Sequence, residues 1–313
     1  MSAVQDAADF DAAVVVVNYR TAALVERCLT TVRATAAELR LETVVVDNAS
    51  GDGSVERLRV ALPDAEVISM GENGGFAAGV NVGFRRSTAE LVIVLNPDTE
   101  VRPGAVQALL ARLRAHPRTG VVAPLLEGPA GELAPNGYRR FPGLLTLSLD
   151  LCVPFAYALA RAPALHPYAM SPATLRAGGR VAHVCGAAMA IRRSAYTQAG
   201  PLDEGFFLYL EETEWQRRVA GRGWAIEVEP AAHVCHLVRG GGEAALAPSP
   251  YWVRSAVRYL HMQGVPTWVS RIVLAVSLAS SWATLRLIAC LPAKRAKATG
   301  QARAYRSLLR ALT

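Results

Sequence analysis

The chain has 313 residues, of which 52% are apolar, and a formal net charge of +7; this length is enough for one large α/β domain and an appendage. Its five cysteines are scattered and odd in number, which argues against a disulfide framework and favours a reducing compartment. The first eleven residues contain three aspartates and no lysine or arginine. A secretory signal begins with basic residues, so we expect no signal peptide there.

Positive charge gathers in the C-terminal part of the sequence. Ten Lys and Arg residues follow Glu243, and no Asp or Glu does. Residues 1–243 contain 23 basic and 26 acidic residues, so that part of the chain is close to neutral. A basic tail is typical of proteins with a polyanionic partner, which is either an anionic membrane surface or a nucleic acid.

Apolar, β-branched runs alternate with amphipathic stretches through residue 125. We predict strands over 12–17, 42–47, 66–70, 91–95 and 120–125, and helices over 22–39, 54–62, 77–87 and 103–116. Gly, Asn, Asp and Ser gather between these elements, as they do in short loops. Strands that alternate with helices in this way predict an α/β domain with a mostly parallel central sheet flanked by helices.

The predicted strand 91–95 ends in Asn96, Pro97 and Asp98. Five successive apolar residues indicate a central strand, and Pro97 ends it because proline cannot donate to a ladder. Ligands of open α/β sheets bind at the carboxyl ends of strands, where a carboxylate can hold Mg or Mn against a diphosphate. The same three residues are also typical of a turn that caps the next helix, and this stretch alone leaves both interpretations open.

The second half of the sequence is less regular. Residues 127–180 are rich in Pro, Gly and Ala, and we interpret them as an excursion whose apolar part, 144–160, lines an acceptor site. Residues 181–191 are predicted to return to the sheet, and 206–210 to lead into an acidic helix. Two further short strands are predicted over residues 224–228 and 232–236.

Residues 250–313 are helical in pattern. Their longest apolar run, 272–285, lies between Arg271 and Arg286 and is shorter than the about 20 residues that a membrane span needs. Because further basic residues follow it, we favour a helix that lies in the plane of an anionic membrane surface. A helix packed on the domain, with a solvated basic end, is the alternative.

Five motifs occur in a fixed order along residues 12–240. They are VVVNYR (15–20), VDNAS (46–50), ENGGFAAGVNVG (72–83), LNPD (95–98) and FFLYLEETE (206–214). With these motifs the sequence resembles the inverting family-two glycosyltransferases of the GT-A fold, and it is most similar to their rhamnosyltransferase-like branch. Each motif alone is weak, whereas five in order are specific.

The resemblance implies a set of residues that bind the nucleotide of the donor. They are Asn18, Tyr19, Arg20, Asp47, Asn73, Gly75, Phe76, Gly79, Asn81 and Asn96. The first four would contact the base and ribose, although an Asp in this place also fits a turn that caps a helix. The next five would form a loop and helix start over the nucleotide, where glycines allow close approach and a helix N-terminus favours phosphate. The glycine order does not match the dinucleotide-binding fingerprint G-x-G-x-x-G.

The resemblance also implies a divalent metal, Mg or Mn, at Asp98, with His236 beside the metal and the diphosphate. The family's common motif has two acids that flank one residue, but Asn96 replaces the first acid here. The ion would therefore depend more on the diphosphate and on water. The remaining His and Cys residues do not have the spacing of a zinc module. Arg239 is a further candidate for countering phosphate charge.

Inverting transfer needs a base on the face of the sugar opposite the leaving diphosphate. The resemblance places this base in the acid pair that opens the late helix, here Glu211 and Glu212. We predict Glu212, which occupies the position of the family's aspartate, with Glu211 as the second candidate. Without the resemblance, the simpler explanation is that acids in a first turn stabilise the helix dipole.

Together these features predict an inverting glycosyltransferase that moves a sugar from a nucleotide diphosphate to a lipid-linked or glycan acceptor in cell-wall or surface polysaccharide synthesis. By resemblance the donor is dTDP-L-rhamnose; a UDP- or GDP-hexose, galactofuranose, or a non-catalytic carbohydrate-binding scaffold are the alternatives. We expect the protein at the cytoplasmic face of the cell membrane, in peripheral contact with anionic lipid and not with nucleic acid. The predicted parts are a disordered N-terminus (1–11), a GT-A domain (12–245, with a nucleotide-binding half 12–125 and an acceptor half 126–245) and a basic, apolar helical extension (246–313).

Overall fold

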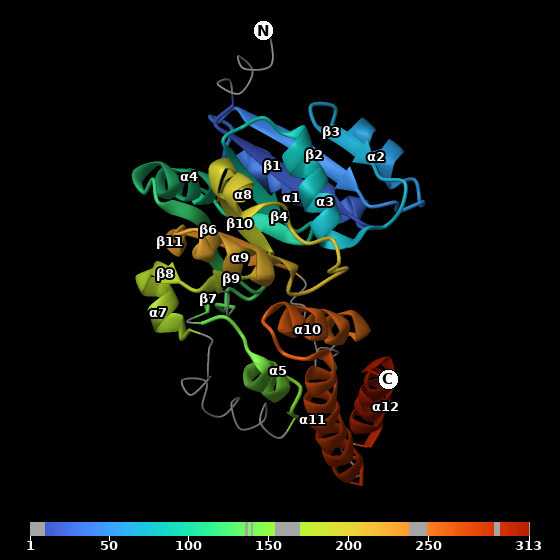
Figure 1. The fold of residues 1–313 in the computed structure, drawn as a ribbon. Coiled ribbons are helices and arrows are strands. Elements are labelled where there is room, and N and C mark those ends of the chain that lie inside the picture. The colour runs from blue at the N-terminus through green and yellow to red at the C-terminus, as the bar shows by residue number, and fades with distance from the viewer. Residues whose placement is uncertain are drawn as a thin grey trace. The chain divides into compact units, whose positions relative to one another are not determined.

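The computed structural model describes residues 10–134, 137–138, 140–153, 170–237, 249–290 and 295–312. These residues divide into two compact units, and Figure 1 shows the elements of each. The first unit contains the described residues of Met1–Arg140, Met170–Phe207 and Glu211–Val238, and the second contains those of Phe141–Ala169, Leu208–Leu210 and Arg239–Thr313. Most of the N-terminus that we predict to be disordered, residues 1–9, lies outside the described residues, as does Arg239.

The first unit is built around one nine-stranded sheet. Its strands are β1 (Ala12–Asn18), β2 (Leu41–Asp47), β3 (Glu66–Ser69), β4 (Leu91–Leu95), β5 (Thr99–Val101), β6 (Thr119–Glu127), β8 (Gly179–Val181), β10 (Ala188–Arg192) and β11 (Ala225–His236). The order is β3-β2-β1-β4-β10-β6-β11-β5, and β8 pairs with β11. Strands β5, β8 and β10 run against the other six. The predicted α/β class with a mostly parallel sheet is therefore confirmed (Figure 1).

Helices cover both faces of this sheet, because the side chains of a strand alternate between its faces. Val14 and Val16 of β1 belong to the same buried cluster as the apolar faces of α1 (Ala22–Thr35) and α4 (Ala105–Ala115). On the opposite face lie α3 (Gly75–Arg86), α8 (Arg193–Ala199) and α9 (Glu211–Gly221), which are joined by aromatic contacts (Figure 1). Helices α2 (Ser54–Ala61) and α7 (Pro172–Ala177) and a ribbon of β7 (Gly137–Tyr138) and β9 (His183–Val184) complete the unit.

Several elements differ from the predicted ones. Strand β5 follows directly after Asp98 and pairs with β11, but its three residues are too few to show a period. The two strands predicted at 224–228 and 232–236 are one strand, β11, whose register shifts around Pro230, because proline within a sheet is confined to edges and bulges. Helix α1 ends at Thr35 instead of residue 39.

The second unit consists of helices in the part that the structure describes. They are α5 (Leu144–Asp150), α10 (Pro250–Met262), α11 (Thr267–Ile288) and α12 (Arg295–Leu312). Ser281 of α11 donates to the Leu151 carbonyl oxygen (2.6 Å) and accepts a hydrogen bond from the Val153 amide (2.8 Å). The start of the predicted acceptor-lining stretch is thus fixed to the C-terminal helices, and its remainder, 154–160, lies outside the described residues.

Helix α11 is longer than the apolar run that marks it in the sequence. It has 22 residues and is, by length and composition, long and apolar enough to cross a membrane. The run 272–285 alone did not indicate this, because α11 extends beyond both flanking arginines.

Candidate active site

The carboxyl end of β4 lies beside the start of β10, because these strands are antiparallel neighbours. The Asn96 amide donates to the carbonyl oxygen of Ala187 (2.8 Å), and the amide of the preceding residue, Gly186, lies 3.4 Å from Oε1 of Glu212. A Cβ atom on Gly186 would come within 3.3 Å of the Glu212 side chain, so the absence of a side chain there lets α9 approach. The segment that ends in Asp98 and the start of α9 therefore meet at one edge of the sheet.

Cys185 shows that acidic groups gather at this edge. Burial, followed by the charges of Glu212, Glu211 and Asp98, raises the pKa of the Cys185 thiol to about 12. Because nearby charges shift a pKa only at short range, the three carboxyl groups lie near one partly buried thiol. The residues that we predict as base and as metal ligand are thus brought together, although they are far apart in the sequence.

Strand β5 places Asp98 next to a histidine of β11. Thr99 pairs with His236 in the antiparallel register of the two strands, and the Leu237 amide donates to the Asp98 carbonyl oxygen (2.8 Å). Oδ2 of Asp98 lies 3.1 Å from Nε2 of His236, and the two side chains are 18% and 16% exposed. This pair is therefore in contact and partly open to solvent.

The donor set of this pair fits a divalent metal that is shared with a ligand. Asp98 supplies a carboxylate and His236 an imidazole, and Mn accepts both kinds of donor. Among the residues that the structure describes, no group of three or more His, Cys, Asp and Glu side chains could hold a metal ion. An ion at this pair would therefore need diphosphate oxygens and water as its other ligands, which is the usual arrangement for Mg at phosphate sites.

The two glutamates that begin α9 sit in an environment that resists their ionisation. Glu211 is 4% exposed, and burial and then the charge of Glu212 raise its pKa well above the ordinary value. Burial also raises the pKa of Glu212. Oε2 of each side chain has no hydrogen-bond partner among the described residues. A buried acceptor without a partner costs about 1–3 kcal/mol, and each of these oxygens has the capacity for one more hydrogen bond.

The backbone before these glutamates is strained. Tyr209 and Leu210 have φ angles of +72° and +67°, which non-glycine residues rarely adopt. Two such residues in succession cost on the order of 1–3 kcal/mol each. Strain of this kind is concentrated at functional sites, which is consistent with the place of the two residues directly before Glu211.

The first two strands end in a hydrogen-bonded turn that includes two predicted nucleotide-binding residues. Asn18 Nδ2 donates to Asp47 Oδ1 (2.6 Å), and Ser50 donates to Asp47 through its amide (3.0 Å) and its hydroxyl (2.6 Å). Asn18 and Asp47 are buried, at 0% and 1% exposed, so their side chains hold β1 and β2 together. Tyr19 and Arg20 are the exposed members of the predicted set at this edge.

Two open pockets adjoin this turn. One, of about 290 Å³, is lined by Asp47 and Met70 among others. The other, of about 320 Å³, is lined by Arg20, and both include Gly53. Volumes of roughly 300 Å³ are at the lower end of the range for small-molecule sites, so the ends of β1, β2 and β3 offer a concave surface of suitable size for a base and ribose.

The loop before α3 is fixed from two sides. Asn73 Oδ1 accepts a hydrogen bond from the Gly75 amide (3.0 Å), and Asn48 Nδ2 donates to the Gly75 carbonyl oxygen (2.9 Å). The Phe76 amide donates to the carbonyl oxygen of Phe207 (3.1 Å). This loop therefore links the end of β2 to the segment that leads to the two glutamates. Asn48 is not among the predicted site residues, although it lies in one of the five motifs.

Gly75 offers a direct test of this link. Its φ is +83°, and a Cβ atom there would lie 2.1 Å from the Phe207 carbonyl oxygen. We expect Gly75→Ala to lower the free energy of unfolding by about 1–3 kcal/mol more than Gly104→Ala does. Gly104 has a similar φ of +80° with no atom within 4 Å, so its substitution costs only the backbone strain, about 1–2 kcal/mol. Urea denaturation measures both values, and equal losses would contradict the contact with Phe207.

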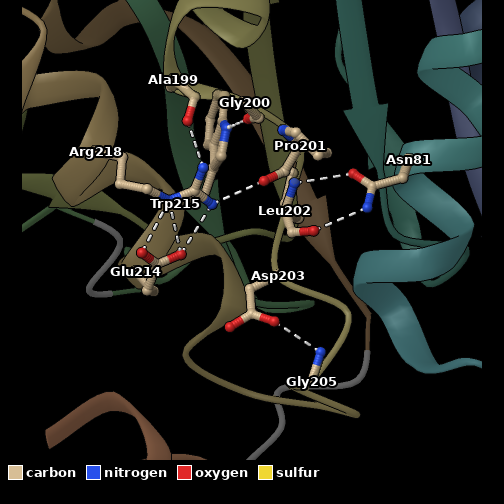
Figure 2. Close-up of polar contacts among 10 residues, drawn as sticks. All are labelled: Asn81, Ala199, Gly200, Pro201, Leu202, Asp203, Gly205, Glu214, Trp215 and Arg218. Carbon is tan, nitrogen blue, oxygen red and sulfur yellow. Dashed lines mark hydrogen bonds and ion pairs between the residues drawn. The ribbon is translucent and has the colours of Figure 1, made fainter. Parts of the chain in front are cut away.

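Asn81, which we predict to bind the nucleotide, makes its hydrogen bonds within the protein. Its side chain donates to the Leu202 carbonyl oxygen (2.9 Å) and to Glu204, and it accepts from the Leu202 amide (2.9 Å) and the Tyr196 hydroxyl (2.8 Å). Figure 2 shows the two bonds with Leu202. These four bonds use both donors and both acceptor positions of the amide. In this structure Asn81 positions the loop that begins at residue 200, and its contact with the nucleotide stays a prediction.

Gly79, in the same helix, permits close packing on the sheet. A Cβ atom on Gly79 would lie 2.6 Å from Val17 Cγ1. The neighbour that glycine lets approach is therefore strand β1, and the close approach of a nucleotide to Gly79 stays a prediction. Both residues seat the helix that begins at Gly75.

The loop before the glutamates is held by residues of α9 that the sequence did not single out. Arg218 and Trp215 donate to the three successive carbonyl oxygens of residues 199–201, and Arg218 also pairs with Glu214 (2.9 Å) (Figure 2). The only sequence signal for this network is the spacing of Glu214 and Arg218, which places an acid and a base one turn apart.

The hydrogen-bonding geometry of the Arg218 guanidinium group is expected to contribute more to stability than its charge does. Arg218→Lys keeps the charge but cannot reach the carbonyl oxygens and Glu214 at once, so we expect a loss of about 1–3 kcal/mol in the free energy of unfolding. Arg222→Lys, an exposed position near the end of the same helix, is expected to change it by less than about 0.5 kcal/mol. Thermal and urea unfolding of both variants test this; an Arg218→Lys protein as stable as Arg222→Lys would sink the idea.

Comparison with known proteins shows which sequences this chain is similar to. The sequence model of Glycosyl transferase family 2 matches residues 13–199. The chain is 29% identical over 239 residues to the N-acetylglucosaminyl-diphospho-decaprenol L-rhamnosyltransferase of Mycobacterium tuberculosis. The matched region covers 71% of this chain and 75% of that protein. It is 29% identical over 211 residues to the low-salt glycan biosynthesis hexosyltransferase Agl10 of Haloferax volcanii, which covers 66% of this chain and 60% of that one.

Solved structures share the fold. GalNAc-T7 with UDP, GalNAc and Mn²⁺ superposes with a TM-score of 0.59 at 16% identity, over 80% of this chain and about half (48%) of that one. The mannosyltransferase PcManGT of Pyrobaculum calidifontis in complex with GDP-Man and Mn²⁺ gives a TM-score of 0.56 at 20% identity, over 97% and 84%. These likenesses confirm the predicted GT-A fold. The chain therefore belongs to glycosyl transferase family 2, and it is a glycosyltransferase.

Proposed function

We propose that this enzyme transfers a sugar, with inversion, from a nucleotide diphosphate to a lipid-linked or glycan acceptor. The observation that carries the proposal is the meeting of Glu212 with the segment of Asp98 at one edge of the sheet, linked through Gly186 and Ala187. L-rhamnose from dTDP-rhamnose is the leading donor, since the Mycobacterium tuberculosis relative is named as an L-rhamnosyltransferase. That relative's name also contains a lipid diphosphate, which supports a lipid-linked acceptor.

Glu212 is assigned the role of general base, with Glu211 as the second candidate. Its carboxylate takes the proton of the acceptor hydroxyl while the hydroxyl oxygen bonds to the anomeric carbon and the bond to the diphosphate breaks on the opposite face. Its raised pKa suits this role, because a base works best when its pKa is near the working pH. The free Oε2 atom is the atom that would receive the proton.

The donor is proposed to bind along the ends of β1, β2 and β4. Tyr19 and Arg20 would face the base and ribose at the pockets described above, and Asp98 and His236 would hold Mg or Mn. The Mn²⁺ in the two solved relatives supports a metal. When bound, such an ion neutralises the negative charge of the leaving diphosphate.

The acceptor is proposed to reach the enzyme at the cytoplasmic face of the cell membrane, in the synthesis of cell-wall or surface polysaccharide. The basic second unit supports contact with anionic lipid. For the domain organisation, the first unit is proposed as the catalytic GT-A domain and the C-terminal helices as its membrane-directed extension. A nucleic-acid partner has no support beyond the basic charge of this tail.

Thermal shift and transfer assays against a donor panel test the proposal. The panel is dTDP-rhamnose, UDP-N-acetylglucosamine, UDP-galactofuranose and GDP-mannose, each with Mn, with Mg and with a chelator. We expect the largest shift with dTDP-rhamnose and Mn or Mg, and a product of inverted anomeric configuration. A larger shift with another donor would identify that sugar as the donor in place of rhamnose, without contradicting the proposed inverting transfer. Binding of sugars without any transfer would indicate a carbohydrate-binding scaffold.

A further inference from the structure

Helix α11 has two apolar faces. Ser270, Leu274, Leu278, Ser281 and Leu285 form its buried face. The opposite face is exposed, and its apolar side chains are Trp268, Ile272, Val276, Ala279, Ala283 and Leu287, which we call the α11 stripe. Steps of three or four residues place these side chains along one line of the helix. Trp268 is 67% exposed and Leu287 is 74% exposed, so no described part of the chain covers either end of the stripe.

A cationic pocket opens at the first turns of the same helix. It has a volume of about 260 Å³ and is lined by Arg254, Arg258 and His261 of α10 and by Thr267 and Arg271 of α11. No Asp or Glu side chain is among the described residues that line it. Arg254 and Arg271 form no ion pair with any residue in the described parts of the chain. Arg254 and Arg271 thus bring to the pocket positive charge that no acidic side chain of α10, α11 or α12 neutralises.

We propose that this pocket binds the phosphate of an anionic phospholipid while the α11 stripe enters the acyl region beside it. Guanidinium groups bind phosphate oxygens in pairs, and the pocket is smaller than typical sites for drug-sized ligands, which suits a head group. Trp268 lies one turn from Arg271, and tryptophan is enriched where the head groups of a membrane meet the acyl chains. The inference deepens the membrane contact proposed above and does not depend on sugar transfer.

The charges on α11 favour a helix that lies along the membrane surface. Arg271 and Arg286 are separated by roughly 22 Å at 1.5 Å per residue, which is less than the about 30 Å of a hydrocarbon core. A spanning helix would also have to give up the packing of its buried face, including the two hydrogen bonds of Ser281. Lying in the surface keeps that face on its own unit and exposes only the stripe to lipid.

Sedimentation of the full-length chain with vesicles tests the pocket. We expect binding to vesicles of phosphatidylcholine mixed with phosphatidylglycerol, and much weaker binding to phosphatidylcholine alone. At about fivefold per arginine, a variant with Arg254→Gln, Arg258→Gln and Arg271→Gln is expected to bind roughly 100-fold more weakly. The matched control removes three exposed arginines of α12 through Arg295→Gln, Arg303→Gln and Arg306→Gln, and is expected to lose less than tenfold. Equal losses would mean diffuse attraction and would overturn the site.

The stripe and the source of the phosphate are tested separately. Lipids brominated on their acyl chains are expected to quench tryptophan emission in the wild type and in Trp224→Phe, but much less in Trp268→Phe. Unchanged quenching in Trp268→Phe, or retention of the chain on membranes after an alkaline carbonate wash, would overturn the surface position. Calorimetric binding of inorganic phosphate without sedimentation on mixed vesicles would assign the pocket to a free phosphate and also overturn the proposal. Transfer to a water-soluble acceptor should persist in the triple variant, which separates this failure from failure of the proposed function.

Discussion

Glu212→Gln is expected to lower kcat by roughly 10²–10⁴-fold, which is the range that a general base contributes. The amide cannot take a proton from the acceptor hydroxyl, but it can still accept the hydrogen bond from the Gly186 amide, so the shape of the site is kept. Donor affinity should therefore change little. Steady-state transfer with saturating acceptor, together with calorimetry of donor binding, separates the two quantities.

Glu211→Gln is the matched control, since it removes the same charge from the same helical turn. We expect it to lose much less activity than Glu212→Gln, because Glu212 is the residue that touches the segment leading to β10. The reverse order of the two losses would move the base to Glu211. Full activity in both variants would leave the reaction without a base at this position.

The pH dependence of this pair has a definite sign. Burial raises the pKa of Glu212 in the folded protein, so transfer should increase as the pH rises through that raised pKa and the base loses its proton. The protonated form stabilises the fold below the unfolded pKa, and this contribution is lost as the pH rises through the folded pKa. Glu212→Gln should therefore raise the melting temperature at pH 8 more than at pH 4. Thermal unfolding at the two pH values measures this, and an equal shift at both would contradict the burial of the charge.

Asp98→Asn is expected to lower kcat/KM by roughly 10²–10³-fold, a loss comparable to that of one preorganised electrostatic contact. Asp98 is the acidic member of the LNPD motif and the partner of His236 at 3.1 Å. Without this charge, the site should bind a metal less tightly. Because the metal neutralises the charge of the diphosphate, the donor should then also bind less tightly. Calorimetry should show weaker donor binding and a smaller difference between Mn and a chelator.

A second histidine–carboxylate pair, between β11 and β6, provides the control. His233 Nδ1 lies 2.7 Å from Glu127 Oε1, and because His233 and His236 are three residues apart on a strand, they point to opposite faces. Glu127→Gln removes the same kind of contact away from the edge of Asp98, so it should leave transfer nearly unchanged. Equal losses in the two variants would show that Asp98 acts through β11 and not through the donor.

Much of the fold could be predicted because its central strands carry strong local signals. The runs at 12–17 and 91–95 are apolar on both faces, which only a central strand requires. The direction of β10 in the sheet had no such signal, because a run of five apolar residues looks the same in a parallel and in an antiparallel strand. Yet its antiparallel course is what carries Gly186 to Glu212.

The candidate site was predictable where a motif residue faces the edge of the sheet, and less so where it faces inward. Asp98 and Glu212 lie at that edge. Asn81 is equally polar in the sequence, but its side chain makes its hydrogen bonds within the protein, two of them with Leu202. Asn48 and Arg218 were missed for the converse reason. They act on backbone carbonyl oxygens, and these partners leave no pattern in a sequence.

The two hydrogen bonds of Ser281 have a consequence for any attempt to shorten this protein. A cut after residue 245, where the predicted GT-A domain ends, would remove the hydroxyl that holds Leu151 and Val153 and leave the retained stretch around α5 with its apolar side uncovered. Such a fragment should aggregate during expression, whereas a fragment that keeps α11 should not. Through these two hydrogen bonds, the C-terminal helices belong to the same folding unit as a segment that begins more than a hundred residues earlier.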